Sequence, residues 1–249
     1  MPLAHLSDRA LLRLSGADAR SFLQGQITND IALLGPDAPL YAGHLSAQGK
    51  TLFAFFLHAD GGDVLIDLPA AQADALAKRL TLYKLRRDVR VAPEPALAVF
   101  AQWGGGDRRF AAPPGAAEPT AALEDWHVHR LTLGLPDGDE ATDLLWLETN
   151  AEALGGVSFT KGCYVGQENT ARMHHRDKVR RSLVALVTAS AHAPGTAIMA
   201  HTPAGPREAG TIRGARHGEL QMAHVKREFT DATLTVDGDS VRFHGPPAR

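Results

Sequence analysis

A single cysteine lies within a segment whose residue types could support chemistry. The segment reads Lys161-Gly162-Cys163-Tyr164-Val165-Gly166-Gln167-Glu168, and Cys163 is the only cysteine of the chain. Its two glycines leave the backbone around the thiol free to adopt tight conformations or to approach a ligand. A nearby lysine and a helix that begins just after the cysteine would both favour the thiolate. The segment predicts a reactive or cofactor-facing thiol, with a small buried residue in a tight turn as the alternative.

A basic stretch follows this segment. Residues 167–173 contain neither Gly nor Pro and predict a helix, on which Glu168 and Arg172 would lie one turn apart and could pair. The cations of the stretch are Arg172, His174, His175, Arg176, Lys178, Arg180 and Arg181, opposed only by Asp177. They predict either an anion site, for a carboxylate tail or a phosphate backbone, or a solvated face near a domain joint. Adjacent histidines on a helix point about 100° apart and chelate one ion poorly, so no metal site is predicted.

Composition narrows the classes of protein that the chain could be. Of its 249 residues, 44% are hydrophobic and 22% are charged, which is ordinary for a globular protein with a sizeable core. One cysteine cannot form an intramolecular disulfide, nor can it hold an iron–sulfur cluster or a structural zinc without other ligands. The near-neutral pI of 6.6 and the 6% aromatic content argue against direct nucleic-acid binding. Without a signal-peptide pattern or a bilayer-length apolar run, a cytoplasmic location and no membrane contact are expected.

The elements that must position the thiol fall into two groups. Before residue 178, the sequence predicts strands at 10–14, 64–68, 89–91 and 97–100, a hairpin over 42–57 that turns near Gln48-Gly49, and helices at 19–25, 70–83, 126–133 and 150–154. Residues 104–115 are rich in Gly and Pro and are expected to form a mobile surface stretch. Short strands are predicted at 183–187, 196–199, 208–212, 220–225, 232–236 and 240–243. They indicate a small barrel or sandwich, so we expect an α+β region over 1–178 and a β-barrel domain over 179–249.

The signature resembles that of a known family. Gly156 to Thr160, then Lys161 to Glu168 and Thr170-Ala171-Arg172, resemble the motif of the YgfZ-type family, which is related in structure to the glycine-cleavage T-protein, an aminomethyltransferase. The continuation Met173-His174-His175 is most similar to the branch of the mitochondrial iron–sulfur cluster assembly factor. Further matches are the block Phe22–Asp30, Gln48-Gly49-Lys50, Arg130 with Gly134-Leu135-Pro136, Glu148 with Asn150 and, more weakly, Gly210-Thr211. Departures are Trp146-Leu147, Gly214 and Ala54. Ala54 stands where relatives often have an acidic or small polar residue, and in the aminomethyltransferases an aspartate in this neighbourhood serves the folate chemistry.

The resemblance implies a T-protein-like fold with a C-terminal β-barrel and a site for tetrahydrofolate. Such a site needs a carboxylate for the pterin edge, apolar walls and a cation for the glutamate tail. The candidates are Glu148 and Glu168 for the edge, Phe22, Phe53, Tyr83 and Tyr164 for the walls, and Lys161, Arg172 or Arg176 for the tail. Gln167 of the signature belongs to the same predicted set. Gln26, Thr28, Asn29 and Asp30 could line the cavity too, or could cap a helix and satisfy a turn.

The function that the resemblance implies is an accessory role, rather than catalysis, in the assembly or repair of [4Fe-4S] proteins, including radical enzymes that modify tRNA. Its partners would be iron–sulfur assembly proteins and [4Fe-4S] client enzymes. Cys163 would be the functional thiol, as one ligand to a cluster shared with a partner or in a redox step. Two alternatives stay open. One is a tetrahydrofolate-dependent aminomethyl or one-carbon transferase, against which Ala54 weighs, and the other is a nucleic-acid-binding module built on the basic stretch and an OB-like barrel.

Overall fold

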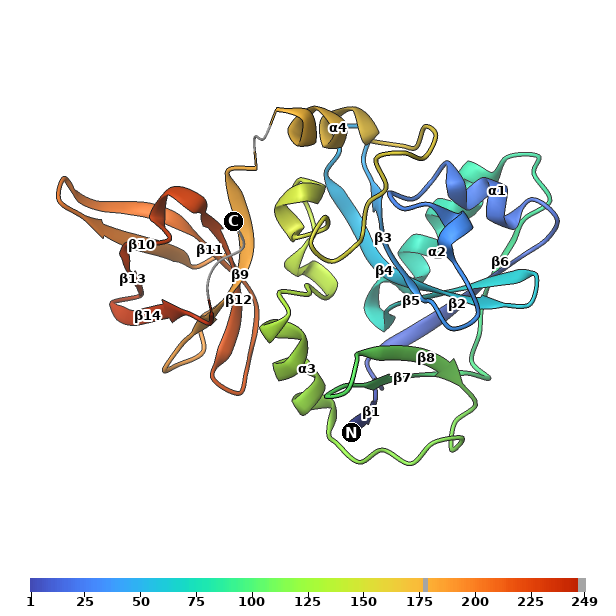
Figure 1. Ribbon diagram of the computed structural model, residues 1–249, viewed down its shortest axis with the longest axis horizontal. Helices are drawn as coiled ribbons and strands as arrows, with labels where there is room; N and C mark the ends of the chain where they lie inside the picture. Colours follow the sequence, from blue (N-terminus) through green and yellow to red (C-terminus); the bar gives the residue numbers. More distant parts are fainter. Residues whose placement is uncertain (177–178, 246–249) are drawn as a thin grey trace.

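The structure is a computed structural model that describes residues 1–176 and 179–245 (Figure 1). Its first part mixes helices and strands, as expected for an α+β protein. The strands of this part are β1 (Leu3–His5), β2 (Arg9–Ser15), β3 (Leu40–Leu45), β4 (Thr51–Asp60), β5 (Asp63–Pro69), β6 (Arg90–Pro93), β7 (Ala98–Gln102) and β8 (Arg108–Ala112). The helices are α1 (Ala19–Gln24), α2 (Ala73–Lys84), α3 (Leu123–Thr132) and α4 (Gln167–His175).

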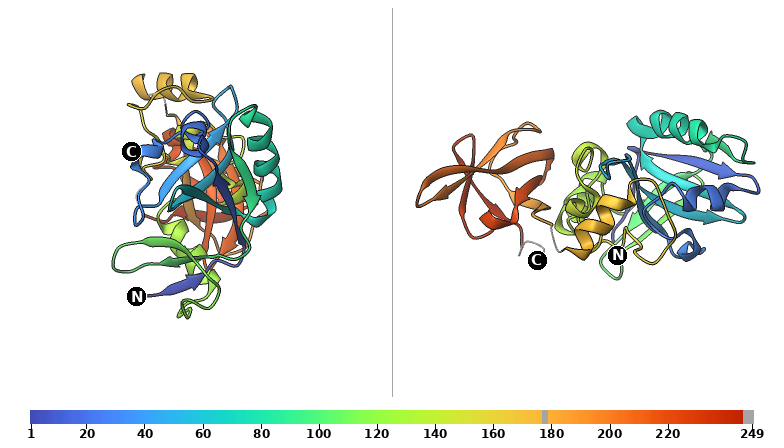
Figure 2. Two further views of the ribbon diagram at one scale, coloured as in Figure 1. Left: turned by 90° about the vertical axis from the view of Figure 1, so that its right-hand side faces the viewer. Right: turned by 90° about the horizontal axis from the view of Figure 1, so that it is seen from above.

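Five of these strands form an antiparallel sheet in the order β3-β4-β5-β2-β6. The predicted hairpin is confirmed, because β3 and β4 pair and the chain turns between them at residues 46–50. α1 and α2 lie at the same end of the molecule as this sheet (Figure 2, right) and pack on one of its faces. The buried core that they share with the sheet includes Leu14, Phe22, Leu57, Ile66 and Leu76. The helices predicted at 19–25 and 70–83 are thus confirmed.

A smaller antiparallel sheet, ordered β1-β7-β8, packs together with α3 against the other face of the large sheet. β8 corrects one prediction, since residues 104–115 are not only a surface stretch. Within β8, Arg108 is exposed, Arg109 is buried, and the Phe110 ring stacks on that of Phe100. This alternation is what a half-buried strand requires, and the glycines lie in the turns on either side of the strand.

A second correction concerns residues 150–154, which lie in turns and not in the predicted helix. The 3-10 helix η4 (Trp146–Thr149) precedes them and ends at Asn150, whose φ is 63°. A residue in the left-handed region cannot continue a right-handed helix. The side-chain amide of Asn150 donates hydrogen bonds to the carbonyls of Gly134 and Leu183, which fixes this conformation.

The C-terminal part is a closed antiparallel barrel, as the spacing of its short strands predicts. Its strands are β9 (Arg181–Val187), β10 (Ala197–Thr202), β11 (Gly205–His217), β12 (Leu220–Lys226), β13 (Thr233–Val236) and β14 (Asp239–Phe243). In the described part of the chain the strands close in the order β10-β11-β12-β9-β14-β13, with β13 paired back to β10. Lys178, the predicted boundary of the two regions, lies outside the described residues.

α3 lies between the barrel and the two sheets (Figure 1). Leu131 of α3 packs with Leu183, Leu220 and Met222 of the barrel in a separate buried cluster. Arg213 of β11 adds polar contacts, donating to the backbone carbonyls of Asp139, Glu140 and Thr142. The barrel is therefore joined to the first part by both apolar and polar contacts. No helix among the described residues is long and apolar enough to cross a bilayer.

Candidate functional site

Cys163 is exposed, on the loop that leads into α4. Figure 1 shows α4 above the ends of β3 and β4, at the edge of the molecule. Gly162 is exposed as well, whereas Lys161 and Tyr164 on either side are partly buried. The loop therefore presents its glycine and thiol to solvent and turns its two large side chains inward. The alternative interpretation, a small buried cysteine, is wrong.

The Lys161 ammonium does not lie free beside the thiol. Its Nζ donates to the backbone carbonyls of Gln24 (2.7 Å), Ile27 (2.8 Å) and Asn29 (2.7 Å). Nζ also lies 5.0 Å from the centre of the Tyr164 ring. Burial lowers the pKa of Lys161 to about 8, and the Asp30 carboxylate opposes that shift. Because an ammonium has three N–H donors, no donor is left for the anionic tail of a folate.

Thr28 and Asn29 are buried and hold the backbone that follows η4. The Thr28 hydroxyl donates to the Gly156 carbonyl (2.7 Å) and accepts from the Gly43 amide (2.9 Å). The Asn29 amide donates to the carbonyls of Tyr41 (2.8 Å) and Gly155 (2.6 Å). These contacts favour the structural role that the sequence left open.

Asp30 and Gln167 also act on their own local backbone. Asp30 caps the 3-10 helix η1 (Ile31–Leu33), because its carboxylate accepts from the Ala32 amide at 3.0 Å. The Gln167 side-chain oxygen accepts from the Tyr164 amide at 3.1 Å. Gln26 gives its backbone carbonyl to His44 of β3. The side chains of Asp30 and Gln167 are thus engaged with the local backbone.

The hairpin turn between β3 and β4 interlocks with the start of α4. Gly49 has φ +78°, and a Cβ there would lie 2.9 Å from the Asn169 Cβ. Gly166 has φ +82°, and a Cβ there would lie 2.4 Å from the Ser46 carbonyl oxygen. The Asn169 amide then donates to the Gln48 carbonyl at 3.2 Å. Both glycines are required by close approach as well as by backbone conformation, so the motif glycines fix the loop more than they free it.

The two remaining residues on α4 point to solvent. Glu168 and Arg172 are exposed, and Arg172 donates to Asn169 at 3.0 Å. Among the described residues no ion pair joins Glu168 to Arg172, so the predicted pair does not form. α4 begins only at Gln167, with Gly166 as its N-cap. The helix dipole acts mainly within the first turn, and Cys163 lies outside that turn.

Glu148 pairs with the barrel. Its carboxylate is 3.2 Å from Nε2 of the buried His224 on β12, and Glu148 itself is partly buried. The predicted aromatic walls are dispersed too. Phe22 lies in the core under α1, whereas Phe53 and Tyr83 flank the His44 ring.

The predicted folate residues are dispersed, so they do not form the single pocket that the sequence suggests. The cavity beside Ala54 has a volume of about 10 Å³, room for about one water molecule, and Tyr41, Phe56 and Arg109 stand on its wall. Larger cavities elsewhere include one of about 480 Å³ beside β8 and one of about 540 Å³ at the start of β9. Neither is lined by any residue of the predicted folate set.

The sequence reading missed a buried ion-pair cluster between the two sheets. Asp67 of β5 accepts from Arg9 (Nε to Oδ1, 2.7 Å) and from Arg109, and Arg9 also pairs with Asp137. Burial alone would raise the pKa of Asp67, but Arg109 and Arg9 hold it well below its usual range. The sequence does contain a sign of this cluster, because Asp67 interrupts the apolar run of β5. In the structure its side chain is fully buried.

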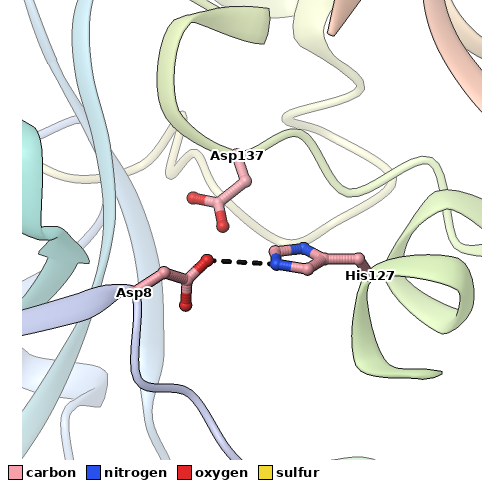
Figure 3. Close-up of side chains that lie close together, drawn as sticks. All are labelled: Asp8, His127 and Asp137. Carbon is pink, nitrogen blue, oxygen red and sulfur yellow. Dashed lines mark ion pairs between the residues drawn. The ribbon is translucent and has the colours of Figure 1, made fainter. Parts of the chain in front are cut away.

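Asp137 also approaches Asp8 and His127, with one ligand atom of each within 4.8 Å of the others (Figure 3). This trio is poorly suited to a metal ion. Arg130 Nε donates to His127 Nδ1 (3.0 Å), so the ring proton lies on Nε2, which faces Asp8 at 3.1 Å. A metal on Nε2 would move that proton to Nδ1, against the Arg130 donor. The trio therefore fastens α3 to the turn before β2.

Comparisons with known proteins agree with the motif. No family model matches the chain. "Iron-sulfur cluster assembly factor IBA57, mitochondrial" of Homo sapiens is 35% identical over 229 residues, 72% of this chain, and the chain covers 64% of its length, less than two thirds. The mouse protein of the same name is 32% identical over 288 residues, 93% of this chain and 79% of the relative. "tRNA-modifying protein YgfZ" of Photobacterium profundum is 30% identical over 227 residues, 74% of this chain and 69% of the relative.

The fold has a counterpart among solved structures. The glycine cleavage system aminomethyltransferase T from Bartonella henselae superposes with a TM-score of 0.67. The match covers 98% of this chain and 85% of that chain at 16% sequence identity. At this identity the likeness shows the fold alone, and it confirms the T-protein-like architecture with its C-terminal barrel.

Proposed function

Because this chain belongs to the family of the iron–sulfur cluster assembly factor IBA57 and the tRNA-modifying protein YgfZ, we propose that it is an accessory factor in the assembly or repair of [4Fe-4S] proteins. Its clients would include radical enzymes that modify tRNA. The observation that carries the proposal is the exposure of Cys163, the sole thiol, on a loop whose neighbouring side chains are engaged in holding it.

The chemistry proposed for Cys163 is ligation. The thiol loses its proton to solvent and its sulfur binds one iron of a cluster that a partner brings, so the cluster is cargo and not a resident cofactor. Clusters of this kind are held by several ligands, and the partner supplies the others. A single redox step at the same thiol is the competing use. Both roles need an exposed sulfur, and both need a second protein.

The surface beside Cys163 supports docking of an acidic protein. Exposed residues of α4 and its C-cap include Arg172, His175 and Arg176, with Glu168 as the one exposed carboxylate of the helix. The Phe159 ring, 38% exposed, stacks on His174 with centroids 3.7 Å apart, so the loop lies against this helix. A partner that presents carboxylates around its cluster would be attracted here, and this attraction would weaken with salt.

Tetrahydrofolate binding stays a prediction, and no step is routed through it. The family relationship motivates it, whereas the contacts of Lys161, Thr28 and Asn29 weigh against the site that the sequence suggests. Titration of the full chain with a reduced folate, followed by calorimetry, tests binding directly. An assay for methylenetetrahydrofolate formation from an aminomethyl donor tests the transferase alternative, for which Ala54 leaves no carboxylate at its position. A cytoplasmic location also stays a prediction, because the animal relatives are named mitochondrial.

The decisive experiment compares two loop variants in a strain depleted of the endogenous factor. Cys163→Ser should abolish activation of a [4Fe-4S] client, since a hydroxyl is a poor iron ligand. Thr160→Ser, a conservative change at an exposed residue of the same loop, should retain it. Full client activity with Cys163→Ser would refute the proposal. In purified protein, only the chain with the thiol should change the absorbance of a cluster-bearing assembly protein on mixing.

A further inference from the structure

Three backbone carbonyls converge on one point beneath the exposed loop. They belong to Gln24, Ile27 and Asn29, and each oxygen lies 2.7 or 2.8 Å from Nζ of Lys161. Gln24 is the last residue of α1, where carbonyls have no partner within the helix and the dipole favours a cation. Carbonyl oxygens that face one another repel unless a cation or a donor lies among them. This carbonyl cradle is therefore a cation site that the chain fills with its own side chain.

The same loop is anchored beyond the thiol as well. The Val165 amide donates to the Gly25 carbonyl at 3.2 Å, within the stretch that forms the cradle. The Tyr164 ring faces Nζ of Lys161, and the backbone amide of Tyr164 donates a hydrogen bond to the side chain of Gln167. Gly162 and Cys163 thus lie between two residues, Lys161 and Val165, that are bonded to the same stretch of backbone. On the upstream side, the next backbone bond to this stretch is that from Ser158 to Thr28.

We propose that Lys161 is a positioning residue, whose ammonium occupies the carbonyl cradle and holds Cys163 at the place where a partner's cluster meets it. The part of this inference that concerns cluster binding by Cys163 rests on the proposed function. The binding of Lys161 in the carbonyl cradle does not. Lys161 touches neither the cluster nor the sulfur in this role. Its loss would leave three carbonyls without donors, and a small cation that donates hydrogen bonds should then be able to replace it.

Chemical rescue tests this inference in the purified full chain. Hydrogen–deuterium exchange is followed over residues 158–166 in wild type and in Lys161→Ala. Because hydrogen bonds to charged groups are the stronger ones, the variant should exchange at least about tenfold faster in this segment. Ammonium chloride should slow exchange toward the wild-type rate, and methylammonium should do so less. Tetramethylammonium at equal ionic strength should have no effect, since it cannot donate and is too large.

Two further variants separate the effect of the charge of Lys161 from the effects of its packing and its shape. Lys161→Met keeps the length of the apolar stem, so it separates loss of the charge from loss of packing if the alanine variant folds poorly. Lys161→Arg keeps the charge, but its planar guanidinium should not satisfy three converging carbonyls. Wild-type exchange in Lys161→Ala without ammonium would overturn the proposal. Equal rescue by all three salts would also overturn it, because that is a bulk salt effect.

Client activation then distinguishes the two proposals. If the positioning role is correct, Lys161→Ala loses client activation at least about tenfold, and ammonium restores it together with the exchange rate. If exchange is rescued while Cys163→Ser activates clients normally, the cradle stands and the proposed function fails. If Cys163→Ser is inactive while Lys161→Ala is fully active without ammonium, the function stands and the positioning role fails.

Discussion

The loop that carries Cys163 and the buried ion-pair cluster around Asp67 differ in what their polar side chains bind. In the buried cluster, Asp67 and Arg9 are paired with other charged side chains. In the loop, Lys161 binds backbone carbonyls and Cys163 is left exposed. A dense group of charges with shifted pKa values often marks a functional site. Here the charged groups are paired with one another, whereas the loop exposes one thiol.

The buried cluster should dominate stability. Replacing Asp67 with Asn removes the carboxylate between Arg9 and Arg109 and leaves charge unpaired in a buried place. Breaking a buried pair from one side costs about 3–5 kcal/mol, so the free energy of unfolding should fall by that amount. Urea unfolding followed by circular dichroism measures it. A loss below about 1 kcal/mol would mean that the cluster contributes like a surface pair, and the contrast with the loop would disappear.

Acid should act on the same cluster. Burial alone would raise the pKa values of Asp67 and Asp137, but arginine neighbours hold both below their usual range. A carboxylate with a depressed folded-state pKa binds protons more readily when unfolded. Its stabilisation is therefore present above about pH 4 and is lost as the pH falls through the folded value, by up to about 1.4 kcal/mol per pH unit and group. The free energy of unfolding should fall more steeply with acid in wild type than in Asp67→Asn, and parallel curves would contradict this.

A substitution where the barrel contacts the first part of the chain should have a smaller effect on the free energy of unfolding. A Cβ at Gly214 of β11 would lie 2.1 Å from Oε1 of Glu140, whose carboxylate is fixed by Arg130. Gly214→Ser should therefore lower the free energy of unfolding by about 1–3 kcal/mol, as overpacking does. Gly62→Ala is the matched control, since a Cβ there meets nothing within 4 Å. Equal stability of the two variants would show that Glu140 can move aside.

The sequence predicts the elements well and the contacts of the site poorly. The strands β9–β14 and the hairpin follow from local periodicity and turn residues, and the motif around Cys163 predicts the loop that the structure shows to be exposed. The hydrogen-bond partners of Lys161 cannot be predicted from local sequence, because its acceptors lie 132 to 137 residues earlier in the chain. Glu148 likewise meets His224 only when the barrel docks. A lysine beside a thiol and a glutamate in a motif suggest ligand binding until tertiary structure shows their partners.

The smallest effect on stability should come from the residue with the largest effect on function. Cys163 is exposed, and its loop is held by Lys161, Tyr164 and Gly166 through contacts that do not involve the thiol. Cys163→Ser should therefore change the free energy of unfolding by no more than about 0.5 kcal/mol, as ordinary surface substitutions do. Urea unfolding under the conditions used for Asp67→Asn makes the comparison direct. A loss above about 1 kcal/mol would show that the sulfur is packed, and inactivity of the variant could then no longer be assigned to the missing ligand.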